Sequence, residues 1–123
     1  MTLLIDATFA ISDSIDNGRS IENVLTHMMT EVGELALEIS IDQGRSYKDA
    51  SEDGVVGEAV DVILCALDVI RLYDPSITAE DILAIAHRKL AKWVEKEEEI
   101  RKRPYWIDLP SSEPKSPVDY LDI

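Results

Sequence analysis

The sequence predicts an all-α protein built as a four-helix bundle. Apolar residues recur at spacings of three and four in four successive stretches, which is the period of an amphipathic helix. No stretch alternates over four or more positions with the β-branched enrichment of a strand. At 123 residues, the chain suits one hydrophobic core rather than two independent domains.

The first two helices are predicted over residues 3–16 and 21–43. The first has an apolar stripe that consists of Leu4, Ala7, Ile11 and Ile15. It is expected to stop at Gly18, which follows an asparagine. Ser20 is a suitable N-cap for the second helix, and Gly44 takes the position just past its end, where glycine is favoured.

The third and fourth helices are predicted over residues 52–73 and 78–102. Asp74-Pro75 halts the third, because proline cannot continue a helix, and Pro104 lies beyond the end of the fourth. Thr78 is an N-cap candidate for the fourth.

Four of the five prolines lie in residues 104–123, which cannot continue a helix. This Pro-rich C-terminal segment also contains large apolar residues, so a disordered tail and a strap packed on a neighbouring surface both stay open. We therefore divide the chain into a helical domain over residues 1–103 and a tail or strap over residues 104–123.

Net charge limits the partners of the chain. Its 25 acidic residues outnumber 12 basic ones, which gives a formal charge of −13. Such a chain repels a nucleic-acid backbone, so we expect no binding to DNA or RNA. A phosphate ligand then needs a cation between itself and the protein.

Cysteine and histidine are too rare for several kinds of site. One cysteine and two histidines exclude an internal disulfide and a zinc site of Cys and His. Neither His27 nor His87 has an acid at the spacing of di-iron bundles, and Cys65 is expected to fill the core. The longest apolar run, residues 62–67, is far below the roughly 18 residues that cross a bilayer. We expect an untargeted, cytoplasmic protein with no membrane segment.

Two pairs of acids at i and i+3 are the main candidates for a functional site. Glu31 and Glu34 lie in the second predicted helix, and Glu58 and Asp61 lie in the third. Residues three apart share a helical face, so each pair can direct two carboxylates to one point. If the helices pack antiparallel, four carboxylates can surround one or two cations. Oxygen-only ligands favour Mg²⁺, or Mn²⁺, over zinc and iron.

The surroundings of Glu58 and Asp61 are almost entirely apolar. Between residues 55 and 70 the only other polar residue is Asp68, and the three acids fall within an arc of about 80° on a helical wheel. We therefore expect this helix to be buried on nearly all sides. A buried carboxylate without a partner costs several kcal/mol, which favours a purposeful site over a solvated face.

The second predicted helix is apolar on two sides. One stripe consists of Val24, Leu25, Met28, Val32, Leu35 and Ile39, and a second side carries Leu37 and Ile41. The acids Glu31, Glu34 and Glu38 lie between them. Such a helix packs on its own bundle and on a further surface, for which a second copy of the chain is the simplest candidate. A homodimer or homotetramer is therefore expected.

At these residues the sequence resembles the MazG-like all-α nucleoside triphosphate pyrophosphohydrolases, whose signature is ExxE on one helix and ExxD on a later one. The matching segments are EVGELALE at 31–38, GEAVDVILCALDVI at 57–70 and KLAKW at 89–93. The resemblance covers residues 20–101 and implies a MazG-like four-helix bundle. It also implies that Glu31, Glu34, Glu58 and Asp61 bind Mg²⁺.

The activity that the resemblance implies is hydrolysis of a (d)NTP between the α and β phosphorus atoms, for house-cleaning or pool control. Magnesium would neutralise the negative charge of the carboxylates and of the triphosphate. It would also lower the pKa of an attacking water. Glu34 and Glu38, one turn apart, are the candidates for the general base. Thr30 departs from the many relatives that carry an acid there, so the number of metal ions stays open.

Basic residues concentrate near the end of the fourth predicted helix. Seven of the twelve lie between positions 88 and 103. Lys89 and Lys92 border the apolar stripe of this helix, where they could reach phosphate oxygens of the substrate. The alternative is that these lysines complement the helix dipole and pair with nearby glutamates.

Two other functions stay open. Phosphoribosyl-ATP pyrophosphohydrolase of histidine synthesis shares the general pattern. A non-catalytic helical interaction module could use the same acids to bind a structural cation or a basic partner.

Overall fold

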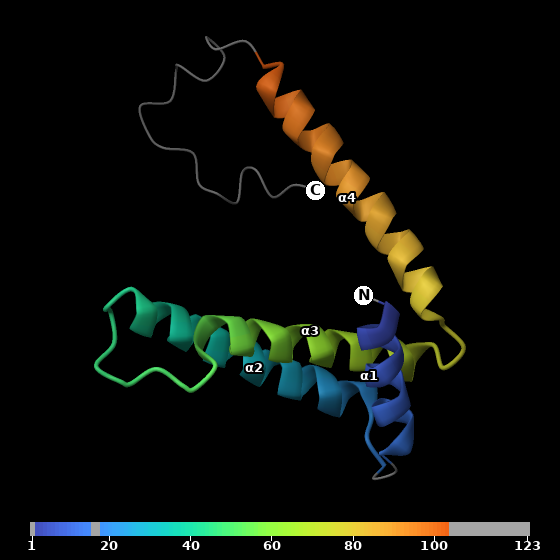
Figure 1. Ribbon diagram of the computed structural model, residues 1–123, viewed down its shortest axis with the longest axis horizontal. Helices are drawn as coiled ribbons and strands as arrows, with labels where there is room; N and C mark the ends of the chain where they lie inside the picture. The colour runs from blue at the N-terminus through green and yellow to red at the C-terminus, as the bar shows by residue number, and fades with distance from the viewer. Residues whose placement is uncertain (1, 16–17, 104–123) are drawn as a thin grey trace. The chain divides into compact units, whose positions relative to one another are not determined.

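A computed structural model of the protein describes residues 2–15 and 18–103, which form four helices (Figure 1). They are α1 (Thr2–Ser14), α2 (Ile21–Asp42), α3 (Gly54–Tyr73) and α4 (Ala79–Arg101). The described residues contain no strand, so the all-α class and the four helices are confirmed. The Pro-rich segment 104–123 lies outside the described residues.

The chain divides into two compact units, Met1–Ala79 and Glu80–Ile123. The first contains α1, α2 and α3, and α4 is the described helix of the second. The arrangement of all four helices as one bundle, and the single domain over residues 1–103, stay predictions. None of the helices in the described ranges is long and apolar enough to cross a membrane.

Both ends of α2 have the predicted caps. The Ser20 side chain accepts a hydrogen bond from the Asn23 N–H at 3.1 Å. At the other end Gly44 has φ of 71°, the left-handed conformation that closes a helix. The Gly44 N–H donates to the Ile41 carbonyl at 2.9 Å, and the Arg45 N–H donates to the Ser40 carbonyl at 2.8 Å. This pair of bonds is a Schellman motif, and it fixes the direction in which the chain leaves α2.

The start of α3 differs from the prediction by two residues. The helix begins at Gly54 rather than at residue 52. Gly54 has φ of 60°, which is incompatible with a right-handed helix running through it. The Gly54 N–H donates to the Ser51 hydroxyl at 3.2 Å, so the preceding loop caps the helix. At the first helix, α1 ends at Ser14, and residues 16–17 lie outside the described ranges.

Within the first unit, α2 and α3 form an antiparallel hairpin, and α1 packs against α3 at the end opposite the connecting loop (Figure 1). The buried apolar residues of these helices are Ile5 and Phe9 of α1, Val24 of α2 and Leu67 of α3. They come from α1, from the beginning of α2 and from the later part of α3. The core therefore lies at the α1 end of the hairpin.

Arg71 fastens α1 to α3. Its guanidinium donates to both carboxylate oxygens of Asp13, at 2.9 and 2.8 Å, and to the Ile77 carbonyl at 3.0 Å. It also lies 4.9 Å from the centroid of the Phe9 ring. The hydrogen bond from Arg71 holds the pKa of Asp13 below its ordinary value. These contacts fix the position of α1 on the hairpin.

The prediction that α3 is buried on nearly all sides is wrong for the single chain. Val56 is 74% exposed, and Val60 and Ile63 are also exposed. The physical reason is that α1 and α2 cover only part of the α3 surface. On α2, apolar side chains are likewise left exposed at Leu25, Met29, Val32 and Ile39.

Candidate metal site

Three of the four predicted metal ligands come together between α2 and α3. Glu31, Glu34 and Glu58 each offer a carboxylate oxygen, and these oxygens lie within 4.8 Å of one another. Glu31 and Glu34 share a face of α2 because they are three residues apart. Glu58 is the fifth residue of α3. The helices α2 and α3 run antiparallel (Figure 1), and their packing brings the Glu58 carboxylate next to the other two. We call these three residues the glutamate trio.

The electrostatics of the trio are unfavourable without a cation. Burial raises the pKa of Glu31, and the hydrogen bond with Glu34 and the charges of Glu34 and Asp61 raise it further. His27, whose Nε2 lies 3.1 Å from a Glu31 oxygen, opposes this shift. The pKa of Glu58 is raised by burial and then by the neighbouring carboxylates. Like charges are therefore held close together, with Glu31 and Glu58 half-buried.

The trio fits a small divalent cation. The Oε2 atom of Glu58 is buried and has no hydrogen-bond partner among the described residues. A buried carboxylate oxygen without a partner is costly, and a cation would supply the missing partner. The donor set contains carboxylate oxygens alone, which suits Mg²⁺ or Mn²⁺ better than zinc.

Asp61, the fourth predicted ligand, lies beside the trio but is not one of the converging residues. It is exposed on α3 and lines a shallow depression together with Asp53, Val56, Gly57 and Val60. Its charge nevertheless contributes to the raised pKa of both Glu31 and Glu58. Its predicted role as a metal ligand stays a prediction.

Glu38, predicted as a candidate general base, is only 6% exposed. Its Oε1 accepts a hydrogen bond from the Ser51 N–H at 2.8 Å, so this carboxylate holds the loop between α2 and α3. Its charge also contributes to the raised pKa of Glu58. The catalytic role predicted for Glu38 is untested, and the contact with Ser51 gives its carboxylate a structural task.

Lys89 and Lys92, the predicted substrate-binding residues, are exposed on α4. This helix belongs to the second unit, whereas the glutamate trio belongs to the first. The contact of these lysines with substrate stays a prediction.

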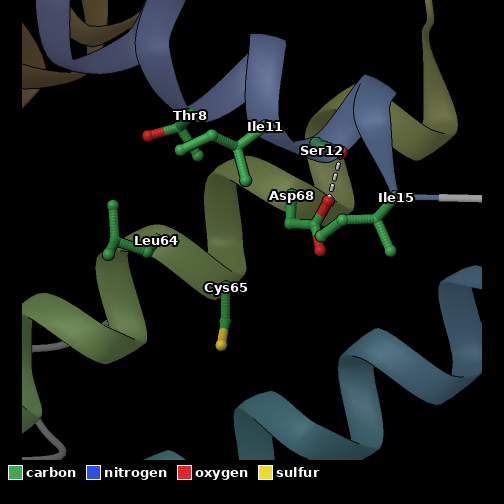
Figure 2. Close-up of a pocket in the computed structure, with 7 residues that line it drawn as sticks. All are labelled: Thr8, Ile11, Ser12, Ile15, Leu64, Cys65 and Asp68. Atoms are coloured by element: carbon green, nitrogen blue, oxygen red, sulfur yellow. Dashed lines mark hydrogen bonds between the residues drawn. The ribbon is translucent and has the colours of Figure 1, made fainter.

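Asp68 has a different task from the other acids of α3. It accepts a hydrogen bond from the Ser12 hydroxyl of α1 (Figure 2) and forms an ion pair with Arg19. Arg19 also donates to the Ser12 carbonyl at 3.1 Å and to its hydroxyl at 3.2 Å. Asp68 therefore joins α1 and the α1–α2 connection to α3. Sequence reasoning missed Ser12 and Arg19, because nothing in their local pattern shows that they meet an acid some fifty residues away.

Cys65 lines an apolar groove between α1 and α3, next to Asp68 (Figure 2). The thiol is half-buried, as expected of a residue that fills space between helices. Burial raises its pKa, and the charges of Glu31, Asp61 and Asp68 raise it further. A thiol in this setting stays protonated at neutral pH and is a poor nucleophile.

Comparison with models of protein families, with curated proteins and with solved structures finds no match to this chain. The functional assignment therefore depends on the geometry of the glutamate trio and on the resemblance of the sequence motifs.

Proposed function

We propose that the protein is a Mg²⁺-dependent nucleoside triphosphate pyrophosphohydrolase that converts a (d)NTP and water to the monophosphate and pyrophosphate. The observation that carries the proposal is the convergence of Glu31, Glu34 and Glu58 from two antiparallel helices. The ExxE and ExxD motifs that contain these residues resemble those of the MazG-like enzymes, and this resemblance supplies the substrate class.

Each carboxylate of the site has a proposed role. Glu31, Glu34 and Glu58 hold the cation, and the exposed side chain of Asp61 is the fourth ligand. A bound Mg²⁺ would polarise a phosphoryl oxygen and lower the pKa of water. Glu34, which is exposed whereas Glu31 and Glu58 are half-buried, is the proposed general base through its second oxygen.

The chemical balance of the reaction is simple. The oxygen of water bonds to the α or the β phosphorus, and the bond between that phosphorus and the α–β bridging oxygen breaks. The leaving group takes the bonding electrons; it is pyrophosphate after attack on the α phosphorus and the monophosphate after attack on the β phosphorus. The proton of the water passes to Glu34 and then to solvent. No oxidant, reductant or second substrate is needed.

The exposed apolar faces of α2 and α3 support a further part of the proposal, that the enzyme is a homodimer or homotetramer. Val56, Ile63, Met29 and Val32 are exposed in the single chain. Exposed large apolar side chains on two neighbouring helices favour a contact site, and a second copy of the chain would cover them. We place the enzyme in the cytoplasm, where a reduced cysteine such as Cys65 is stable.

The proposal is tested by measuring pyrophosphate release from a panel of NTPs and dNTPs with Mg²⁺. Wild type is compared with Glu34→Gln and Glu58→Gln, and Glu22→Gln serves as control because Glu22 is an exposed acid at the start of the same helix, away from the trio. We expect wild type and Glu22→Gln to form both products. The two trio variants should be slower by at least about 100-fold.

Two results would contradict the proposal. One is undiminished turnover by Glu34→Gln. The other is no turnover by the folded wild type of any nucleotide, phosphoribosyl-ATP included, which would favour the interaction module. Turnover of phosphoribosyl-ATP alone would assign the enzyme to that reaction instead.

A further inference from the structure

Two basic side chains of the first unit have no ion-pair partner among the residues that the structure describes. Its other two arginines are occupied, Arg19 by Asp68 and Arg71 by Asp13. Arg45 and Lys48, by contrast, are exposed and form no ion pair with any described residue. Both lie in the loop between α2 and α3, residues 43–53. In a unit so rich in acidic residues, basic side chains without an ion-pair partner are uncommon, and their position suggests where a negatively charged ligand could bind.

The backbone of this loop is held at both of its ends. Arg45 donates its N–H to the Ser40 carbonyl in the Schellman motif, which fixes the place where its side chain leaves α2. At the other end Ser51 makes two bonds, one from its N–H to Glu38 and one from the Gly54 N–H to its hydroxyl.

These anchors lie close to the glutamate trio. The two partners of Ser51 are Glu38, four residues after Glu34 on α2, and Gly54, four residues before Glu58 on α3. Each partner is therefore about 6 Å from a member of the trio along the helix axis. Lys48 is three residues from Ser51, hence at most about 11 Å along the chain. The loop connects the end of α2 to the start of α3 (Figure 1), and its attachment points are therefore within about one turn of Glu34 and of Glu58.

We propose that the loop of residues 43–53 is the phosphate-binding element of the site, in which Arg45 and Lys48 contact the phosphate oxygens that the cation leaves unneutralised. Glu38 is a positioning residue, which holds the loop through the Ser51 N–H. This inference rests on the proposed function, because it takes a cation-bound triphosphate as the ligand. Charged hydrogen bonds from Arg and Lys are a common way for proteins to bind phosphate.

Affinity for a substrate analogue tests the two cations. The probe is a nucleoside triphosphate with a methylene group between the α and β phosphorus atoms, titrated calorimetrically into the full chain with Mg²⁺. We expect Arg45→Gln and Lys48→Gln each to weaken analogue binding about tenfold, the usual effect of one charged hydrogen bond. Lys102→Gln is the matched control, because Lys102 is exposed but lies just past α4. It should bind like wild type.

Binding of Mn²⁺ alone separates the loop from the metal site. The loop variants should keep wild-type affinity for Mn²⁺, followed by its electron paramagnetic resonance signal, because neither residue belongs to the trio. Equal losses of Mn²⁺ and analogue affinity would overturn the proposal by showing that the loop acts on the metal site itself.

The positioning role of Glu38 has its own test. Glu38→Ala should speed hydrogen exchange of the amides of residues 43–53 and weaken analogue binding. Glu38→Gln keeps an oxygen that can accept from Ser51, so it should restore slow exchange and most of the affinity. Rapid loop exchange in Glu38→Ala with unchanged analogue affinity would refute the link between loop position and phosphate binding.

The remaining outcomes distinguish this inference from the proposed function. If wild type binds Mn²⁺ and the analogue, and the loop variants bind the analogue as tightly as wild type, the loop proposal is overturned. The proposed enzymatic activity is not affected by that result. A folded wild type that binds neither probe overturns both.

Discussion

Glu58 and Asp68 both lie half-buried on α3, and their amide substitutions are expected to change stability in opposite directions. The Asp68 and Arg19 side chains of the ion pair are 18% and 17% exposed. Asp68→Asn keeps the size of the side chain but removes the charge that Arg19 and the Ser12 hydroxyl contact. Losing hydrogen bonds to a charged group costs about 1.5–3 kcal/mol. In a chain of this size that lowers Tm by roughly 5–15 °C.

Glu58→Gln removes a charge from a place where charge is unfavourable. The Oε2 of Glu58 is buried without a partner, and its pKa is raised by burial and by nearby carboxylates. A glutamine amide could donate to the neighbouring oxygens of Glu31 and Glu34. The metal-free variant should therefore have a higher Tm than the metal-free wild type, as often happens when a functional site is neutralised.

Thermal unfolding followed by circular dichroism, in EDTA and in Mg²⁺, checks both variants. With Mg²⁺ at 100 times its Kd, wild type and Asp68→Asn should each gain about 2.7 kcal/mol, whereas Glu58→Gln should gain far less. The reasoning would be refuted if Glu58→Gln were less stable than wild type in EDTA, or if Asp68→Asn lost the response to Mg²⁺.

Three further predictions concern pH, the core and the loop. Because the pKa of Glu58 is raised, the folded chain binds more protons than the unfolded chain above pH 4.5. Metal-free wild type should therefore lose stability relative to Glu58→Gln as the pH rises from 4.5 through the raised pKa. Unfolding titrations at several pH values measure this difference. The Ile5 side chain is only 1% exposed. Ile5→Ala should therefore lower the free energy of unfolding, measured in urea, by about 2–5 kcal/mol because of the cavity it leaves. Gly44→Ala should lower the free energy of unfolding by about 1 kcal/mol in the same assay. The reason is strain, because φ at this position is 71° and no atom lies within 4 Å of an added Cβ. An unchanged urea midpoint would contradict the packing argument for Ile5→Ala and the strain argument for Gly44→Ala.

The helices were predictable because their signals are local. The apolar period, the Ser20 cap and Gly44 each act within a few residues, and the structure confirms them. The predicted start of α3 was wrong by two residues, because the neighbouring residues do not predict the left-handed conformation of Gly54. The burial of α3 was overestimated because a sequence shows that a face is apolar but not what covers it, as the exposure of Val56 illustrates.

For the site, spacing predicted which acids share a helix face but not which acids meet. Glu31, Glu34 and Glu58 converge, while Asp68, on the same arc of α3, turns to Arg19 instead. The arginine and its target are 49 residues apart, so their pairing depends on how α1 packs. The contact between Glu38 and the Ser51 N–H is likewise a product of the loop conformation, which no local spacing rule describes.

The proposed activity depends on the binding of a divalent cation by the glutamate trio. Crystals of the full chain grown with Mn²⁺ and measured for anomalous diffraction test it most directly, because manganese gives a signal that carboxylates and water do not. We expect an anomalous peak in contact with carboxylate oxygens of Glu31, Glu34 and Glu58. A well-diffracting crystal with no peak there, or with manganese bound only elsewhere, would contradict it.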